Sequence, residues 1–282
     1  MDWTEPIRGV GEHLVGVFTH PLNLTALAMF CALAVLEYAF PARPLPPVRG
    51  WRSKGTLFLL LGITISSSTP LLWDAYLSRY TLLDATALGD VGGAIAGFVV
   101  YELGVYTWHR AMHASTLLWR VFHQMHHSAE RIDVFGAFYF HPLDTVAFSL
   151  VTSVSLVGVL GLTPNAAMTA SLMLTFCNFF QHANVRTPRW LGYVIQRPES
   201  HGVHHARGRH AFNYSDMPLW DVLFGTFRNP AKCTDAAGFY DGASARVFSM
   251  LVGRDVSRPH VGRDWQEAVA AGYGKEEVSW TR

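Results

Sequence analysis

Histidine is the residue type whose spacing in this chain could do chemistry. The 282 residues include 14 histidines, and most of them fall into short-spaced groups. Neutral imidazole binds zinc, copper, iron and nickel. A structural zinc ion takes four ligands and a catalytic one takes three, so histidines in this number, if they converge, indicate two metal ions in one pocket. The groups are His109 and His113; His123, His126 and His127; His141; His182; and His201, His204, His205 and His210.

The spacing within the groups suits a helix. His109 and His113 are four residues apart, as are His123 and His127, and residues four apart lie on the same helix face. His126 follows His123 by three residues. If residues 107–113 and 118–128 are helical, each group presents its imidazoles on one face.

Long apolar runs separate the histidine groups. The chain is 50% hydrophobic and 15% charged, and a membrane span needs roughly 20 mostly apolar residues. The composition therefore predicts an all-α integral membrane helical bundle with four or five spans. The predicted spans are residues 22–40, 55–73, 91–108 and 142–162, with a shorter return leg over 165–180.

Three glycines in the third run, Gly92, Gly93 and Gly97, do not form a phosphate-binding loop. They are interpreted as small faces that allow close helix packing.

The loop charges predict an orientation. The loop over residues 74–90 carries only one cation, Arg79, whereas the loop over 41–54 carries four. Because positively charged loops stay in the cytoplasm, the first loop should be cytoplasmic. Every histidine group then emerges at the cytoplasmic face of the membrane, in a helical cap that holds the dimetal site. The four cations are Arg43, Arg49, Arg52 and Lys54.

Three segments together resemble the signature of a known family. Glu102–His113 contains HxxxH, and His123–Ser128 and His201–His205 each contain HxxHH, which is similar to the pattern of the fatty acid hydroxylase/sterol desaturase superfamily. The resemblance covers roughly residues 102–227. Supporting elements are His141-Pro142, Gln181 to Asn184, Arg197-Pro198, Asn213-Tyr214 and Trp220 to Thr226.

The resemblance implies three regions. Residues 1–108 hold the N-terminal spans and their loops, and residues 102–230 form the catalytic region with a membrane hairpin. The more polar residues 231–282 are expected to form a C-terminal cytoplasmic tail.

The resemblance also implies a membrane-bound, di-iron, O2-dependent enzyme that hydroxylates or desaturates a lipid, either a sterol or other isoprenoid or a fatty acyl chain. The chain has no haem-attachment motif, cysteine cluster or dinucleotide fingerprint. Electrons, ultimately from NAD(P)H, should therefore arrive through a separate ferredoxin or cytochrome with its reductase. The expected docking residues are Arg110, Arg120, Arg131, Arg207 and Arg209, which could equally hold lipid head groups.

The metal ligands that the family motif implies are nine histidines. Some family members have a further histidine one helical turn before the position of His182, where this chain has Asn178. Asn178, a water molecule or His141 would then complete the coordination of one metal. The nine are His109, His113, His123, His126, His127, His182, His201, His204 and His205.

Two acidic residues are candidates for supporting roles. Glu102 lies two helical turns before His109, in a span where an unpaired carboxylate is costly, and we expect it to orient an imidazole. Asp221 either braces the last histidine group or belongs to an ordinary turn. His210 is expected on the solvated surface. Structural roles are expected for His13, His20 and His260.

Two other functions compete with lipid oxidation. A zinc-dependent membrane hydrolase would hold zinc and turn over without O2. A metal-binding or transport protein would place its histidines along a path through the spans, whereas here they gather at one side. The net charge of +1 gives no basic field for nucleic acid.

Overall fold

The computed structural model describes residues 4–259, and this part of the chain is helical, with no β-strand and a single isolated bridge between Ala206 and Ala237. The predicted all-α fold class is therefore confirmed. Short 3-10 and π-helical turns join the α-helices, including a π-helical turn over Trp119–His123. The α-helices are α1 (Thr4–Thr19), α2 (Pro21–Ala39), α3 (Trp51–Ser68), α4 (Asp74–Leu77), α5 (Gly89–Ala114), α6 (Thr116–Leu118), α7 (Gln124–His127), α8 (Pro142–Ser153), α9 (Pro164–His182), α10 (Pro198–His204), α11 (Pro218–Leu223) and α12 (Val247–Leu251).

Proline begins several of these helices. Helices α2, α8, α9, α10 and α11 each have proline in the first turn, where its missing N–H costs nothing and its fixed φ favours the helix. The side chains of His20, His141 and Thr163 precede three of these prolines and accept a hydrogen bond from a backbone N–H of the first turn. Local sequence thus sets where these helices begin.

Four helical stretches in the described part of the chain are long and apolar enough to cross a membrane. They coincide with the four longer runs predicted from the sequence, and α9, the predicted return leg, is not among them. The four are Pro21–Ala39, Trp51–Tyr80, Thr86–Ala114 and Pro142–Val159.

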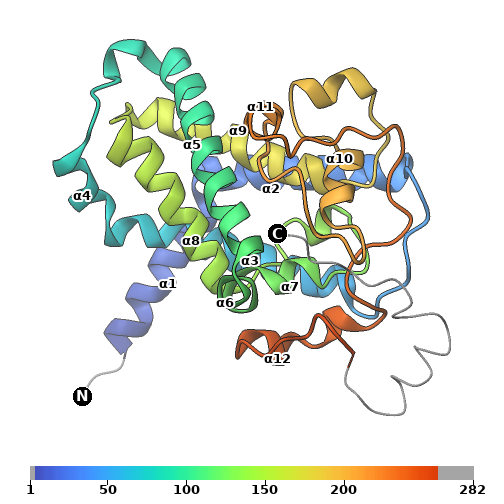
Figure 1. Cartoon of the computed structure of the whole chain (residues 1–282). Helices are drawn as coiled ribbons and strands as arrows, with labels where there is room; N and C mark the ends of the chain where they lie inside the picture. Colours follow the sequence, from blue (N-terminus) through green and yellow to red (C-terminus); the bar gives the residue numbers. More distant parts are fainter. Residues whose placement is uncertain (1–3, 260–282) are drawn as a thin grey trace, which may run out of the picture.

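Helix α5 packs along α9 and also contacts α8 (Figure 1). Two glycines allow α5 to approach its neighbours. A Cβ added at Gly93 would lie 2.9 Å from the Cβ of Ala166, and one added at Gly97 would lie 2.8 Å from Leu162 Cδ1. The predicted packing role is confirmed for these two glycines. It is wrong for Gly92, whose added Cβ would meet only Leu88 of the preceding turn.

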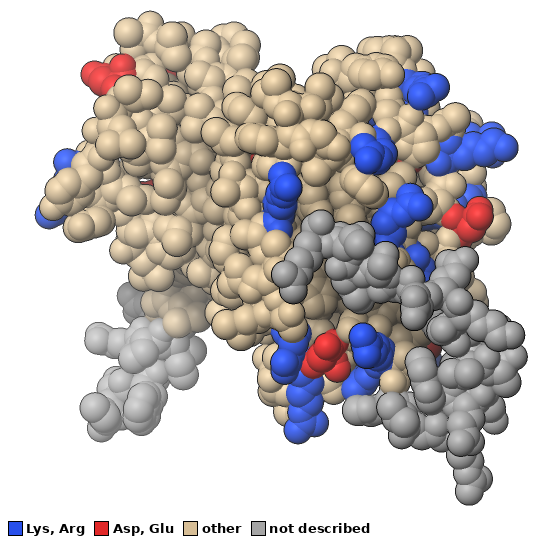
Figure 2. Space-filling model, viewed as in Figure 1, with Lys and Arg blue, Asp and Glu red and all other residues tan. Residues whose placement is uncertain are grey.

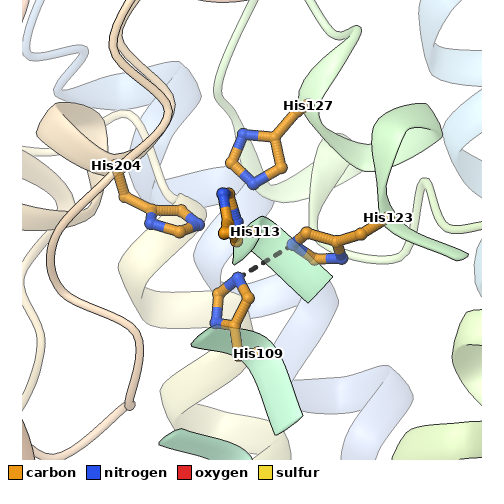
Figure 3. A group of neighbouring side chains, drawn as sticks. All are labelled: His109, His113, His123, His127 and His204. Atoms are coloured by element: carbon orange, nitrogen blue, oxygen red, sulfur yellow. Dashed lines mark hydrogen bonds between the residues drawn. The ribbon is translucent and has the colours of Figure 1, made fainter. Parts of the chain in front are cut away.

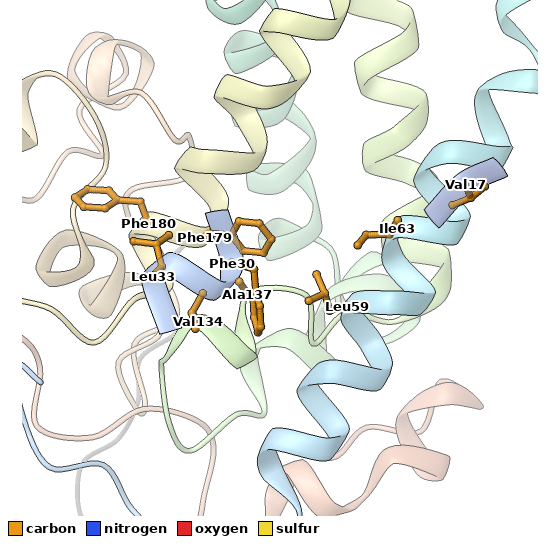
Figure 4. Close-up of a cluster of buried hydrophobic side chains, with 9 residues drawn as sticks. All are labelled: Val17, Phe30, Leu33, Leu59, Ile63, Val134, Ala137, Phe179 and Phe180. Carbon is orange, nitrogen blue, oxygen red and sulfur yellow. The ribbon is translucent and has the colours of Figure 1, made fainter. Parts of the chain in front are cut away.

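The main hydrophobic cluster ties the N-terminal helices to the histidine-bearing part of the chain (Figure 4). Phe30 of α2 packs edge-to-face on Phe179 of α9, with ring centroids 5.6 Å apart. Leu59 and Ile63 of α3 and Val134 join the same cluster. Burial of aromatic and aliphatic side chains in this way fixes α9, which carries His182, against α2.

A second cluster places the segment after residue 230. Phe239, Met250 and Val256 pack with Trp51 and Tyr139. The hydroxyl of Tyr139 also donates a hydrogen bond of 2.7 Å to the carbonyl of Ser244. The predicted C-terminal tail is therefore packed against α3 as far as the structure describes it. His260 lies outside the described residues.

Candidate metal centre

The nine predicted histidines converge as two adjacent groups. Within each group, the candidate ligand nitrogens all lie within 4.8 Å of one another. The rings of the first group point toward a common centre in Figure 3. The five-histidine group contains His109, His113, His123, His127 and His204, and the four-histidine group contains His126, His182, His201 and His205.

Helix geometry explains how each HxxHH motif divides between the groups. Successive α-helical residues are rotated by about 100° around the helix axis. In HxxHH the first and last histidines, four residues apart, therefore differ by only about 40°, whereas the middle histidine is about 100° from the last one. His123 and His127 accordingly share the five-histidine group, and His126 faces the four-histidine group. In the second motif, His201 and His205 share the four-histidine group, and His204 belongs to the five-histidine group. The expectation that each group presents its imidazoles on one face is therefore wrong for the two HxxHH motifs, although His109 and His113 do share the five-histidine group.

The two groups are in direct contact. The rings of His127 and His205, one from each group, are stacked with centroids 4.3 Å apart and an interplanar angle of 18°. The His123 and His126 rings are 5.3 Å apart. Two ions bound in these groups would share one pocket, as the number of histidines predicted.

Hydrogen bonds at Nδ1 orient the rings of the five-histidine group. The Nδ1 atoms of His109 and His204 lie 2.7 Å from the carbonyl oxygens of Tyr214 and Phe212, to which they donate. His123 Nδ1 lies 2.7 Å from the carboxylate of Asp144. A donor bond at Nδ1 fixes the tautomer that leaves Nε2 free to bind metal.

The four-histidine group is held differently. Its Nε2 atoms form a chain in which His126 and His182 are 3.1 Å apart, and His201 lies 3.0 Å from both His182 and His205. Only His182 has a polar partner at Nδ1, the carbonyl of Asn178 at 2.7 Å, whereas the Nδ1 atoms of the other three are buried without one. The tight cluster of Nε2 atoms suits a shared cation better than a set of neutral hydrogen bonds.

The residues present fit metal ions. The Nε2 atoms of His113, His127 and His204 are buried and have no hydrogen-bond partner, an arrangement that is costly unless a ligand satisfies them. Burial lowers the pKa of His127, His204 and His205 well below the usual value for histidine, so these rings are neutral and able to coordinate. Five nitrogens around one point also exceed the tetrahedral set of a zinc ion.

Glu102 and Asp221 both act on the loop that follows Phe212. The Glu102 carboxylate accepts hydrogen bonds from the backbone N–H groups of Asp216 and Met217 at 2.7 and 3.1 Å. Asp221 accepts from the N–H groups of Tyr214 and Ser215 at 2.9 and 3.0 Å. The expected contact of Glu102 with an imidazole is not present. Instead, both carboxylates hold the loop whose Tyr214 carbonyl orients His109.

Helix α10 is anchored by the polar residues that the family pattern singled out. Asn213 Nδ2 donates to the carbonyl of Ser200 at 2.8 Å, and the buried Arg197 guanidinium donates to the carbonyl of Thr187 at 2.9 Å. The Arg197 guanidinium also lies 3.3 Å from Glu199. These contacts fix the helix that carries His201 and His204 and ends in front of His205.

The structure does not bring His141 or Asn178 into either histidine group. His141 Nδ1 accepts a hydrogen bond from the backbone of Leu143 as the N-cap of α8. The Asn178 side chain donates to the carbonyl of Ala137 at 3.2 Å, and its own carbonyl holds His182. Asn178 does line the cavity described below.

His210 was predicted on the solvated surface, and this prediction was wrong. Its side chain is buried, and its Nδ1 lies 3.0 Å from His127 Nδ1. The backbone at His210 has a positive φ of 43°, a conformation that turns the chain back over the five-histidine group. Neighbouring Arg207 and Arg209 suggested exposure in the sequence and hid this contact.

A cavity of about 730 Å³ opens from the histidines into the helical bundle. Its walls come from α1, α2, α3, α5, α8 and α9, and the side chains of Tyr101, Phe148, Leu156 and Phe179 are among them. It reaches the rings of His109, His123, His126, His182 and His201. A mostly apolar cavity of this size is typical of small-molecule sites.

Two carboxylates at the site were not selected from the sequence. Asp144 binds His123, and the signal available for it was a carboxylate within an apolar run. Asp216 lines the cavity, and its Oδ1 accepts a hydrogen bond of 2.7 Å from Gln181. Burial raises the pKa of Asp216 to about 6. No local pattern marks Asp216, because its position depends on the loop held by Glu102.

Comparisons with known proteins agree with the geometry. Residues 94–226 match the fatty acid hydroxylase family. The chain is 30% identical over 169 residues to the ornithine lipid hydroxylase OlsE of Rhizobium tropici, which covers 58% of this chain and 50% of that protein. It is 23% identical over 137 residues to sphinganine C4-monooxygenase 1 of Arabidopsis thaliana, covering 47% of this chain and 53% of the relative.

A further relative is the Delta(7)-sterol-C5(6)-desaturase of Nicotiana tabacum, 28% identical over 141 residues, or 48% of this chain and 49% of that protein. The chain thus spans about half the length of the curated relatives it matches. No solved structure matches it. The matched region contains α10, most of α5 and all nine histidines. Over this region, the chain is similar to members of the fatty acid hydroxylase/sterol desaturase superfamily.

Proposed function

We propose that this protein is a membrane-bound, O2-dependent hydroxylase or desaturase of a lipid. The observation that carries the proposal is the arrangement of nine imidazoles in two touching groups at the end of a long, mostly apolar cavity. The names of the relatives support it, because they describe a lipid hydroxylase, a monooxygenase and a desaturase.

The chain's own residues would hold two iron ions. The five-histidine group offers one set of Nε2 atoms and the four-histidine group the other. Bound iron would supply the redox chemistry with O2 that oxidation of an unactivated C–H bond requires. Asp144 and the carbonyls of Tyr214 and Phe212 keep the imidazoles of the five-histidine group in the tautomer that can coordinate.

The cavity walls would position the substrate. Phe140 stacks on the His126 ring with centroids 4.2 Å apart, and Phe148 lies 6.4 Å from both His109 and His123. These rings exclude water from the histidine end of the cavity and leave room for an alkyl chain. A hydrocarbon segment held there would present a C–H bond to the metal centre.

The proposed orientation has the histidine groups at the cytoplasmic face of the membrane. The charged side chains support it, because Lys and Arg gather over one half of the face seen in Figure 2, while the other half is nearly free of charge. The exposed leucines and valines of α2, α3 and α5 would face lipid.

A separate electron donor would dock on the charged half. Of the arginines suggested by the sequence, Arg120 is committed to the carbonyl of Gly253, with its Nη2 at 2.7 Å. Arg131 pairs with Asp133 at 2.6 Å. Arg209 is exposed and is the better candidate for contact with an acidic ferredoxin or cytochrome. A reduction rate that does not change with salt would contradict electrostatic docking.

The alternatives are less consistent with the site. A zinc hydrolase needs about three protein ligands and an open position, whereas one group here offers five. A transporter would need ligands along the spans, and the nine histidines instead gather at one end of the cavity.

The test compares lipids extracted from cells that express the wild-type chain or the His204→Ala variant, with and without O2. Wild-type membranes should contain a lipid that gains one oxygen or loses two hydrogens only when iron and O2 are present. His204→Ala should insert in the membrane but lose metal and activity together. The His260→Ala control, outside the described residues and outside the histidine pattern, should lose neither. Normal turnover by His204→Ala would refute the site.

A further inference from the structure

The cavity is elongated along the bundle. Its lining residues on α9 run from Ala167 to His182, and at 1.5 Å of rise per residue they span about 22 Å. The two histidine groups of the candidate metal centre lie at one end. The other part of the wall comes from α1, the start of α2, the end of α3 and the segment that leads into α4. It is lined by His13, His20, Asn23, Ser66, Ser67 and Asp74.

The charges on the cavity wall have one sign. None of the described residues that line it is a lysine or an arginine, and the two formal charges are the carboxylates of Asp74 and Asp216. A fatty acid carboxylate or a phosphate in the part of the cavity away from the histidine groups would find no lysine or arginine to pair with. Moving an unpaired charge into such surroundings is costly, so the wall selects against anionic lipid groups.

Of these two carboxylates, Asp74 has an oxygen that accepts no hydrogen bond. Its Oδ1 is buried and has no hydrogen-bond partner. Asp216 differs because its Oδ1 already accepts from Gln181. The two imidazoles that line this part of the cavity have neutral partners, since His13 Nε2 bonds to Ser68 Oγ at 2.8 Å and His20 Nδ1 accepts from the backbone of Leu22.

We infer that the substrate is a lipid with an amine group, and that Asp74 binds its ammonium. A charge-assisted hydrogen bond from the ammonium would satisfy the unpartnered Oδ1. The inference rests on the proposed function in taking the cavity as the lipid site. It adds the chemical class of the polar group, which neither the family match nor the histidines define.

The position of Asp74 separates the amine from the reacting carbon. Helix α4, which begins at Asp74, packs against residues 154–159, whereas Asp144 at the start of α8 binds His123. The intervening ten or more residues place the two ends about 15 to 20 Å apart along the helix. With the ammonium on Asp74, the hydrocarbon chain rather than the polar group reaches the histidines.

The test measures binding rather than turnover. The full chain, purified in digitonin without an electron donor, is titrated with hexadecylamine, hexadecanol or palmitate, and the affinity is taken from the rise in Tm. Wild type should bind hexadecylamine most tightly and palmitate most weakly. Asp74→Asn should lower the affinity for hexadecylamine about tenfold, which is the loss expected for one charge-assisted contact of roughly 1.4 kcal/mol. The affinity for hexadecanol should not change.

The matched control is Asp84→Asn. Asp84 lies in the same connection between α3 and α5, outside the cavity lining, and its carboxylate bonds only to Thr86. It should bind all three ligands as wild type does. Palmitate binding as tight as hexadecylamine, or an unchanged amine affinity in a folded Asp74→Asn, would overturn the inference. If Asp74→Asn does not fold, the order of the wild-type protein's affinities for the three ligands decides whether the inference stands. No step of the assay requires oxidation, so failure of the proposed activity would be seen separately.

Discussion

At the scale of single residues, ligand identity could be predicted from spacing, but the supporting residues could not. HxxxH and HxxHH each place residues at separations that helices bring together, and the eight histidines of these motifs converge together with His182, which the family resemblance supplied. Their partners are mostly backbone carbonyls, such as those of Tyr214 and Phe212. Carbonyls carry no sequence signal. His210 was misjudged because its burial depends on a tertiary turn.

The pairing of Asp144 with His123 gives a prediction at this scale. Asp144→Asn keeps the shape and an acceptor oxygen but removes the negative charge that strengthens the imidazole as a ligand. Partners of this kind typically contribute about 10- to 100-fold to metal affinity. We expect a loss of about tenfold in competition with a chelator, with expression in the membrane retained.

Asp90→Asn is the control for that experiment. Asp90 is an exposed carboxylate at the start of α5 and accepts hydrogen bonds from Thr163 and Asn165, far along the helix from the histidines. Its replacement should leave metal affinity unchanged. Equal metal affinity of Asp144→Asn and wild type would show that the ion pair does not support His123.

At the scale of elements, apolar runs predicted the long helices because a span needs length and hydropathy, both of which are properties of the local sequence. The division of each HxxHH motif between two groups could not be predicted in the same way. It depends on the rotation of α7 and α10 about their axes, and α10 is fixed by contacts from Arg197 and Asn213 that lie outside the motif.

The glycines of α5 give a prediction about helix packing. At Gly97 an added Cβ would lie 2.8 Å from Leu162 and 2.9 Å from Leu156, whereas at Gly92 it would meet only Leu88 at 3.3 Å. Gly97→Val should push α5 away from its neighbours and lower the Tm of the purified protein, at a cost of about 1 to 3 kcal/mol. Gly92→Val should have a much smaller effect. Equal Tm changes in the two variants would contradict the packing described for α5.

At the scale of the whole molecule, the structure joins an apolar bundle to a buried, histidine-rich end. That end contains many imidazoles that burial keeps neutral, and His210 is the clearest case because burial lowers its pKa to about 3. The sequence could predict that the histidines gather at one end, since the spans alternate in direction. It could not predict the cavity, whose walls combine helices from distant parts of the chain, such as α1, α5 and α9.

Burial of neutral histidines predicts a pH dependence of the metal-free protein. Between the ordinary histidine pKa of 6.5 and the folded value of about 3, the unfolded chain binds a proton at His210 that the folded chain does not. Stability therefore falls as the pH falls through this window, by about 1.4 kcal/mol per pH unit for each such histidine. Denaturant unfolding of the chelated protein should show lower stability at pH 5 than at pH 7. An unchanged or higher stability at pH 5 would contradict neutral burial.

Lipid oxidation by this protein can be tested by tracing the oxygen atoms of O2. Reconstituted iron-loaded protein, supplied with membrane lipid and an electron donor, is incubated under ¹⁸O₂, and the lipids are examined by mass spectrometry. We expect a lipid that carries one ¹⁸O atom, or a lipid that has lost two hydrogens only while ¹⁸O₂ is consumed. A lipid product that forms without O2 and takes its new oxygen from water would contradict this expectation and would favour the zinc hydrolase.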